Sequence, residues 1–238
     1  MRPLFPFYGS KWRDARRYQP PGHTVVEPFA GSAGYATYYE PDRVMLYDRD
    51  PIVVGVWHYL IKASSADILA LPDLEVGQSI DDCPSLPQEA RWLIGFWLNR
   101  GSATPKKTKT AFSARTDRQQ LIWSERARVR IASDVEKIRH WQVREGSYET
   151  APRVDATWFI DPPYVDKGRY YRMRHVNYID LAEWCQHLTG PVIVCEQAGA
   201  TWLPFRPLAT IKSTRGVSAE MVWTSEAEPN PTLFALCL

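Results

Sequence analysis

The chain has 238 residues, of which 45% are hydrophobic and 24% are charged, an ordinary composition for a globular protein with one sizeable core and room for an inserted subdomain. It has no apolar run of the ~18 residues that a membrane span needs, and the start MRPLFPFYG is unlike a signal peptide. The four cysteines are widely spaced and no His cluster has metal-ligand spacing. We therefore expect a cytoplasmic protein with no membrane partner and no metal.

The net charge of +2 is unevenly distributed. Between Arg100 and Arg144 the sequence has twelve Lys/Arg and four Asp/Glu, a balance of +8, which leaves −6 for the remainder. A basic block within an otherwise acidic protein is expected of a partner that is a polyanion. The alternative is a solvated helical face, because charge runs are common on protein surfaces.

The first third of the chain alternates between strand and helix patterns. An apolar strand is predicted over 24–30, followed by a helix in GSAGYATYY, with Ser32 placed to cap it. A second strand over 43–50 ends in acids, and the helix PIVVGVWHYLIKA follows with Pro51 in its first turn. This β-α-β-α order predicts an α/β protein with a doubly wound, Rossmann-like sheet flanked by helices.

The pattern changes over 63–140. Helices are predicted over 86–100 and 118–141, with the loop GSATPKKTKTAFSART between them and no convincing strand. We expect an inserted helical subdomain here, which contains most of the basic block.

Strand patterns resume after the insert. Strands are predicted over 154–160 and 190–198, with a helix over 179–188 and weaker strands over 205–211, 220–224 and 232–237. We therefore expect a catalytic domain formed by 1–62 and 141–238, interrupted by the target-recognition insert 63–140.

The stretch VEPFAGSAG joins the first strand to the first helix, where an open α/β sheet binds ligands. Its small residues allow close approach to the backbone, but it is neither G-x-G-x-x-G nor a P-loop with its lysine. Glu27 would repel a phosphate and suit a cationic ligand, and Asp48 at the end of the second strand is placed to bind a ribose diol. A ligand with a ribose, a positive charge and no phosphate describes S-adenosylmethionine.

The stretch TWFIDPPY ends a buried strand in an acid, two prolines and a ring. The prolines favour a stiff, extended loop, in which the Asp161 carboxylate and the Pro162 carbonyl are both free acceptors. Two acceptors beside the Tyr164 ring fit the exocyclic amino group of adenine, with the ring stacking on a base flipped out of the duplex. The alternative is a rigid turn with a satisfied Asp161 and a packed Tyr164.

Several motifs together resemble the Dam-type DNA adenine methyltransferases, which occur in bacteria and phages and as partners of restriction enzymes. They are FPFYGSKW (5–12), VVEPFAGSAGYA (25–36), YDRDP (47–51), FWLNR (96–100) and FIDPPY (159–164). The order of the motifs also matches: cofactor motifs, a helical recognition insert, then the catalytic loop. The resemblance implies a class I methyltransferase sheet, S-adenosylmethionine as donor with S-adenosylhomocysteine as product, and double-stranded DNA as substrate of a monomeric enzyme.

The resemblance also implies roles for individual residues. The catalytic residues would be Asp161, Pro162 and Tyr164. The cofactor would be bound by Phe7, Lys11, Glu27, Phe29, Gly31, Asp48 and Asp161. From the basic block rather than from the resemblance, we expect DNA to be bound by Arg100, Lys106, Lys107, Lys109 and Arg115, in or near the loop of the insert.

The sequence departs from the family in two places. The loop after FWLNR matches no family residue individually, so the target sequence is not predicted. In VREGSYE, Ser147 stands where the family has an acid, and Tyr148 is expected near the cofactor adenine.

The main hypothesis is therefore adenine-specific methylation of DNA. One alternative is an RNA adenine methyltransferase, and the other is a DNA-binding protein with a catalytically weak methylase core. Whether a cognate restriction enzyme is a partner is left open.

Overall fold

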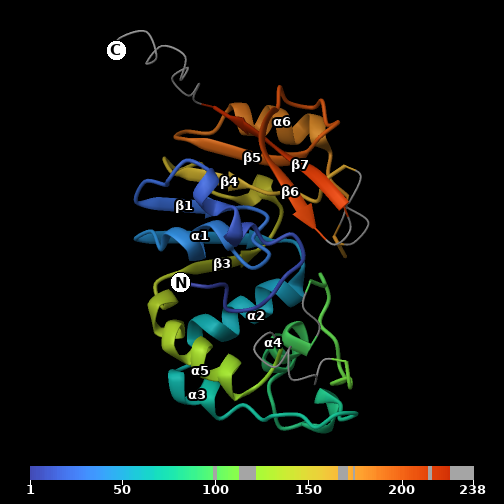
Figure 1. The fold of residues 1–238 in the computed structure, drawn as a ribbon. Coiled ribbons are helices and arrows are strands. Elements are labelled where there is room, and N and C mark those ends of the chain that lie inside the picture. Colours follow the sequence, from blue (N-terminus) through green and yellow to red (C-terminus); the bar gives the residue numbers. More distant parts are fainter. Residues whose placement is uncertain (99–100, 113–121, 166–170, 174, 214–215, 226–238) are drawn as a thin grey trace, which may run out of the picture.

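The computed structural model describes residues 1–98, 101–112, 122–165, 171–173, 175–213 and 216–225. Seven strands form one sheet in the order β3-β2-β1-β4-β5-β7-β6 (Figure 1). They are β1 (Thr24–Glu27), β2 (Arg43–Asp48), β3 (Gln142–Glu145), β4 (Thr157–Ile160), β5 (Val192–Gln197), β6 (Arg206–Ser213) and β7 (Gly216–Thr224). β1 to β5 are parallel, while β7 runs antiparallel to both β5 and β6. The protein is thus α/β with a mostly parallel sheet, as the sequence predicted.

The α-helices are α1 (Gly34–Tyr39), α2 (Pro51–Lys62), α3 (Ser65–Leu69), α4 (Gln88–Leu98), α5 (Glu125–Asp134) and α6 (Tyr178–Gln186). Short 3₁₀ turns are η1 (Lys11–Arg13), η2 (Ala15–Arg17), η3 (Ile80–Asp82), η5 (Val135–Ile138) and η6 (Tyr148–Thr150). None of the described helices is long and apolar enough to cross a membrane.

The central strands bury both faces. All four residues of β4 and all six of β5 are buried, which explains why their sequences are continuous apolar runs rather than alternating ones. Successive residues point to opposite faces, so Val25 packs with α1 and α2 while Val26 packs with α6. Helices therefore cover both faces, as in a doubly wound sheet.

In the strand order β3-β2-β1-β4-β5, the chain builds the sheet outward from β1 in one direction and then from β4 in the other. The topological switch point therefore lies between β1 and β4. Val25 lies opposite Val44 of β2 on one side and Thr157 of β4 on the other. The carboxyl ends of β1, β2 and β4 therefore meet at one edge, where open α/β sheets bind ligands.

Several predicted elements differ in their boundaries, and the strand predicted over 24–30, for example, ends at Glu27. The strand predicted over 43–50 ends at Asp48, because the Asp50 side chain accepts a hydrogen bond from the Ile52 N–H and caps α2. Ser32 does not cap α1, so this prediction was wrong. Residues 31–33 form a tight turn instead, in which Gly31 and Ala33 have φ of 47° and 46°, and Ala33 occupies the cap position.

β3 was not predicted. It is a four-residue edge strand in which only Val143 is buried, so its sequence lacks the apolar pattern of the central strands. The predicted strand over 232–237 lies outside the described residues.

The helices of the insert pack on the seven-stranded sheet through α2. α4 packs against α2, and α5 against α3, on the side of the molecule away from β5, β6 and β7 (Figure 1). The buried residues of α4 and α5 belong to the same hydrophobic cluster as those of α2. The described parts of the insert contribute no strand to the sheet; they contain an isolated bridge between Ser79 and Thr108.

Candidate active site

The turn after β1 is held by its backbone. The Ala30 N–H donates to the Tyr47 carbonyl at 2.9 Å, and the Gly31 N–H donates to Asp48 Oδ2 at 2.9 Å. From α2, the indole N–H of Trp57 donates to the Gly31 carbonyl at 2.8 Å. The turn is therefore fixed relative to β2 and α2 before any ligand binds.

The glycines of this turn admit the chain's own N-terminal segment. A Cβ on Gly31 would lie 2.9 Å from the Phe7 ring, and one on Gly34 would lie 2.8 Å from the Lys11 backbone nitrogen. The Ser32 hydroxyl donates to the Ser10 hydroxyl at 2.9 Å. The small residues of the turn were expected to let a ligand approach the backbone closely. They also let the N-terminal segment approach it, which places Phe7 and Lys11 beside the ends of β1 and β2.

Glu27 ends β1 and is almost completely buried. The Ala36 N–H of α1 donates to its Oε1 at 2.7 Å. Burial raises the pKa of Glu27 from 4.5 to about 8, with Asp161 adding to the shift and the Ala36 hydrogen bond opposing it. At neutral pH Glu27 therefore keeps its proton until a positive charge enters the site.

Asp48 ends β2 and uses both carboxylate oxygens. Besides Gly31, the Asp50 N–H donates to its Oδ1 at 2.9 Å. Burial raises the pKa of Asp48 to about 6, although these backbone hydrogen bonds oppose the shift. Asp48 is thus a structural clamp between β2 and the glycine turn, and each oxygen keeps a second lone pair for a hydroxyl donor.

Asp161 follows β4 directly and pairs with a buried lysine. Lys11 Nζ lies 2.9 Å from Asp161 Oδ1, and the Lys11 side chain is only 8% exposed. Burial raises the pKa of Asp161; the Lys11 ammonium opposes this shift, and Glu220 adds to it. Lys11 contacts Oδ1, and the Tyr164 side chain also interacts with the Asp161 carboxylate and lowers its pKa.

The loop after Asp161 is held at its far end. The Tyr178 hydroxyl of α6 donates to the Pro163 carbonyl at 2.5 Å, and the Tyr164 hydroxyl donates to Glu220 Oε1 at 2.6 Å. Lys11 Nζ lies 4.6 Å from the centroid of the Tyr164 ring. Among the described residues, none donates a hydrogen bond to the Pro162 carbonyl, and Pro162 itself is buried.

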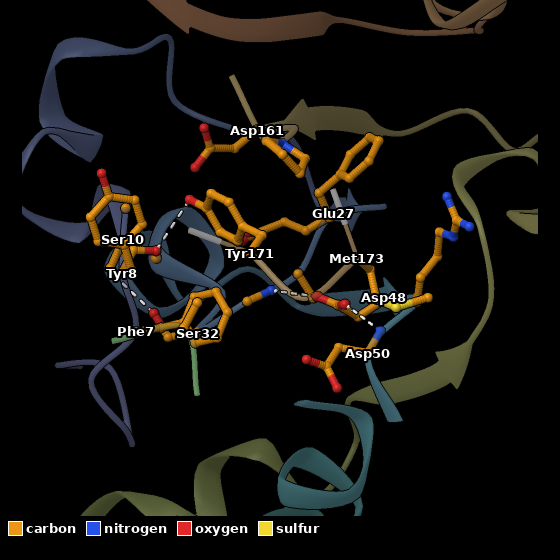
Figure 2. A pocket seen from close by; sticks show the side chains of 18 of the residues that line it. Phe7, Tyr8, Ser10, Glu27, Ser32, Asp48, Asp50, Asp161, Tyr171 and Met173 are labelled. Carbon is orange, nitrogen blue, oxygen red and sulfur yellow. Dashed lines mark hydrogen bonds between the residues drawn. The ribbon is translucent and has the colours of Figure 1, made fainter. Parts of the chain in front are cut away.

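One pocket joins these segments, with about 750 Å³ of empty space including its open mouth. Its lining contains every residue predicted to bind the cofactor: Phe7, Lys11, Glu27, Phe29, Gly31, Asp48 and Asp161. Figure 2 shows Asp161 and Asp48 on opposite sides of Glu27 and Tyr171. Pro163 lines the pocket, whereas Pro162 and Tyr164 are not among its lining residues.

The segment after the D-P-P-Y loop also lines the pocket and was missed in the sequence analysis. Tyr171, Arg172 and Met173 all belong to the lining. The Tyr171 ring lies 6.1 Å from that of Phe7 and 5.6 Å from that of Tyr8. Gly9 accommodates it, because a Cβ there would lie 2.4 Å from the Tyr171 hydroxyl. The aromatic and basic stretch YYRMR, close after D-P-P-Y, was the available signal.

Several cations of the basic block are used within the protein. Lys107 pairs with Asp81 at 2.7 Å, and Lys109 donates to the Leu74 carbonyl at 2.6 Å. In α5, Arg128 pairs with Asp73 at 2.7 Å. Lys106 is exposed and pairs with no described carboxylate. Of the predicted DNA contacts, Arg100 and Arg115 lie outside the described residues.

Tyr148 lies beside the pocket rather than in its lining. Its ring stacks on that of Phe29 with centroids 5.8 Å apart, and Phe29 does line the pocket. Ser147 precedes it at the cap position of η6 and makes no side-chain capping bond. Tyr148 therefore supports the pocket wall through Phe29.

Comparison of the chain with models of known protein families, and a search of curated proteins, found no match.

Proposed function

We propose that this protein is an S-adenosylmethionine-dependent methyltransferase that modifies the exocyclic amino group of adenine in DNA. One observation carries the proposal: the D-P-P-Y acid Asp161 and the two strand-end acids Glu27 and Asp48 line the same pocket. Glu27 and Asp48 are the last residues of β1 and β2, and Asp161 directly follows β4. From the residues alone, Glu27 and Asp48 are assigned to binding of the methyl donor, and Asp161 to binding of the adenine amino group. The resemblance to Dam-type methyltransferases agrees with this assignment.

The charges of the pocket fit a cationic nucleoside. Glu27 is buried and Asp48 is half-buried, and their pKa values are raised to about 8 and about 6, so a positive ligand would offset the cost of their ionisation. A ribose diol could donate to the remaining lone pairs of Asp48, and Phe29 offers an apolar wall. When bound there, S-adenosylmethionine would supply a methyl group on a positively charged sulfur.

The chain's own groups would activate the acceptor. The amino nitrogen of adenine is a poor nucleophile, because its lone pair is delocalised into the ring. The Asp161 carboxylate and the Pro162 carbonyl would accept its two hydrogens and favour a localised lone pair. Once the nitrogen has gained the methyl group it must lose a proton, and Asp161 is the nearest carboxylate to take it. Acceptors aimed at charge that develops in the transition state contribute roughly 3–4 kcal/mol each, by analogy with oxyanion holes.

DNA as the acceptor rests on the resemblance and on the basic block. The internal pairs of Lys107 and Lys109 reduce the number of free cations, so exposed Lys106 is the best described candidate for a phosphate contact. RNA adenine is the alternative acceptor, and a DNA-binding protein with a weak methylase core is the alternative without catalysis. An intact D-P-P-Y loop, with Asp161 and Pro163 in the pocket lining, has no use in a protein that only binds DNA, which favours the enzyme.

The test is transfer of radiolabelled methyl from S-adenosylmethionine to unmethylated genomic DNA, followed by nucleoside analysis. We expect label in N6-methyl-2′-deoxyadenosine, and a 10²–10³-fold lower kcat, about 3–4 kcal/mol, for Asp161→Asn. The matched control is Asp155→Asn, which removes an exposed carboxylate from the opposite end of β4 and leaves the pocket lining intact.

The outcomes separate the three hypotheses. Label in RNA and none in DNA would replace the acceptor, because contacts to the 2′-hydroxyl distinguish the two nucleic acids. Binding of DNA and cofactor with no label in any acceptor would indicate the weak methylase core. Equal rates for Asp161→Asn and wild type would refute the role of Asp161.

A further inference from the structure

Glu220 lies on β7 and is buried. It is far in sequence from the glycine turn after β1 and from the D-P-P-Y loop. In the sheet it pairs with Gln197 of β5 and Ala209 of β6. Its Oε1 accepts hydrogen bonds from the hydroxyls of Tyr164, at 2.6 Å, and Tyr18, at 3.0 Å. The final antiparallel strand thus contributes a carboxylate directly behind the catalytic loop.

The same oxygen of Glu220 also contacts Lys11. Lys11 Nζ lies 3.4 Å from Glu220 Oε1 and 2.9 Å from Asp161 Oδ1, so one ammonium is shared between two carboxylates. The side chains of Lys11, Asp161 and Glu220 are 8%, 18% and 7% exposed, so water screens these charges little. The position of each group in the trio therefore depends on the other two.

From this geometry we infer that Glu220 is a positioning residue for Asp161: it shares the Lys11 ammonium and anchors Tyr164, so that Asp161 stays a strong hydrogen-bond acceptor for the target amino group. This inference rests on the proposed function. Without the Glu220 charge, Lys11 would pair with Asp161 alone. A carboxylate that is fully paired accepts hydrogens from a neutral amine less strongly and is less easily protonated.

The effect of Glu220 on Asp161 can be measured as a change in the pKa of Asp161. The titratable groups that interact with it from the packed elements are Lys11, Glu27, Tyr18, Tyr164, Tyr171, Cys195, Glu196 and Glu220. Lys11 is the only cation in this set of described residues. Lys11 lowers the pKa of Asp161 and Glu220 raises it, so removing the Glu220 charge should lower that pKa.

The experiment is a ¹³C NMR titration of the Asp161 carboxyl carbon in the full chain, assigned by its loss in Asp161→Asn. We expect a lower apparent pKa of Asp161 in Glu220→Gln than in wild type. Tyr18→Phe is the matched control, because it removes a hydrogen bond to the same Glu220 oxygen without changing any charge. An unchanged titration in Glu220→Gln, or an equal shift in Tyr18→Phe, would overturn the inference.

Glu220→Asp covers the case in which Glu220→Gln does not fold. Its shorter side chain withdraws the charge from Lys11, so the pKa of Asp161 should again fall, by less than in Glu220→Gln. An unchanged value in a folded Glu220→Asp would contradict the inference just as directly.

Kinetics supply the second readout. In Glu220→Gln we expect kcat to fall on the order of tenfold, by analogy with groups that orient catalytic ligands. The acidic limb of the kcat profile should move to lower pH, while KM for S-adenosylmethionine stays within about twofold. A purely structural role would not move that limb. If the wild-type protein methylates no nucleic acid, the proposed function fails, whereas the titration still decides whether Glu220 controls Asp161.

Discussion

Glu27→Gln tests the central electrostatic feature of the pocket, a carboxyl group that is protonated at neutral pH. The variant keeps the shape of the side chain and an oxygen for the Ala36 N–H, but it cannot ionise. The folded protein holds the Glu27 proton to about pH 8, whereas the unfolded chain releases it near the ordinary value of 4.5. The folded state thus binds more protons across this window, so its stability falls as pH rises from 4.5 to 8.

The magnitude follows from the two pKa values. Their difference, 8 − 4.5 = 3.5, corresponds to about 5 kcal/mol, accumulated at about 1.4 kcal/mol per pH unit. Below the window, protonated Glu27 and the glutamine are both neutral, so the two proteins should be similarly stable. Above pH 8, Glu27→Gln should be more stable than wild type by about 5 kcal/mol.

Urea unfolding at a series of pH values between 5 and 9 measures this difference, provided that both proteins have the same m-value. The contribution of Asp48, whose pKa is also raised, cancels because it is common to both proteins. Glu183→Gln, an exposed glutamate of α6, reports the effect of the substitution itself. A difference between Glu27→Gln and wild type that stays constant from pH 5 to 9 would refute the reasoning.

Three further predictions concern ligand binding and the glycine turn. Calorimetry should show S-adenosylmethionine binding wild type more tightly as pH rises toward 8, with proton release, because a cation favours ionised Glu27; Glu27→Gln should show neither effect. Gly34→Ala should cost about 1–3 kcal/mol in thermal or urea unfolding, because its Cβ would lie 2.7 Å from the Trp12 backbone nitrogen; Gly22→Ala, with 3.9 Å to its nearest neighbour, should be tolerated. In DNA binding, Lys106→Ala should reduce the slope of log K against log salt by about 0.9, and an unchanged slope would remove Lys106 from the interface.

The sequence alone was sufficient to predict the sheet and the edge at which the site lies. The apolar runs of β4 and β5 mark buried parallel strands, and the acids Glu27, Asp48 and Asp161 each stand at or directly after a strand end. Because the carboxyl ends of parallel strands share one edge, these local patterns predict that the acids meet. The four-residue edge strand β3 was not predicted, because a short strand with one buried residue has almost no hydrophobic pattern.

Side-chain partners were decided by the tertiary structure. The motifs do not indicate that Lys107 and Arg128 are paired with Asp81 and Asp73, so the net charge of the insert overstated its free cations. Nor do they indicate that Lys11, near the N-terminus, lies between Asp161 and Glu220, because those contacts require η1, β4 and β7 to be in place together. Hydrophobic periodicity and turn chemistry depend on residues that are close neighbours in the sequence, so they can be recognised from the sequence alone. The pairing of a buried charge depends on groups that lie far apart in the sequence, and only the folded sheet brings them within a few ångströms of each other.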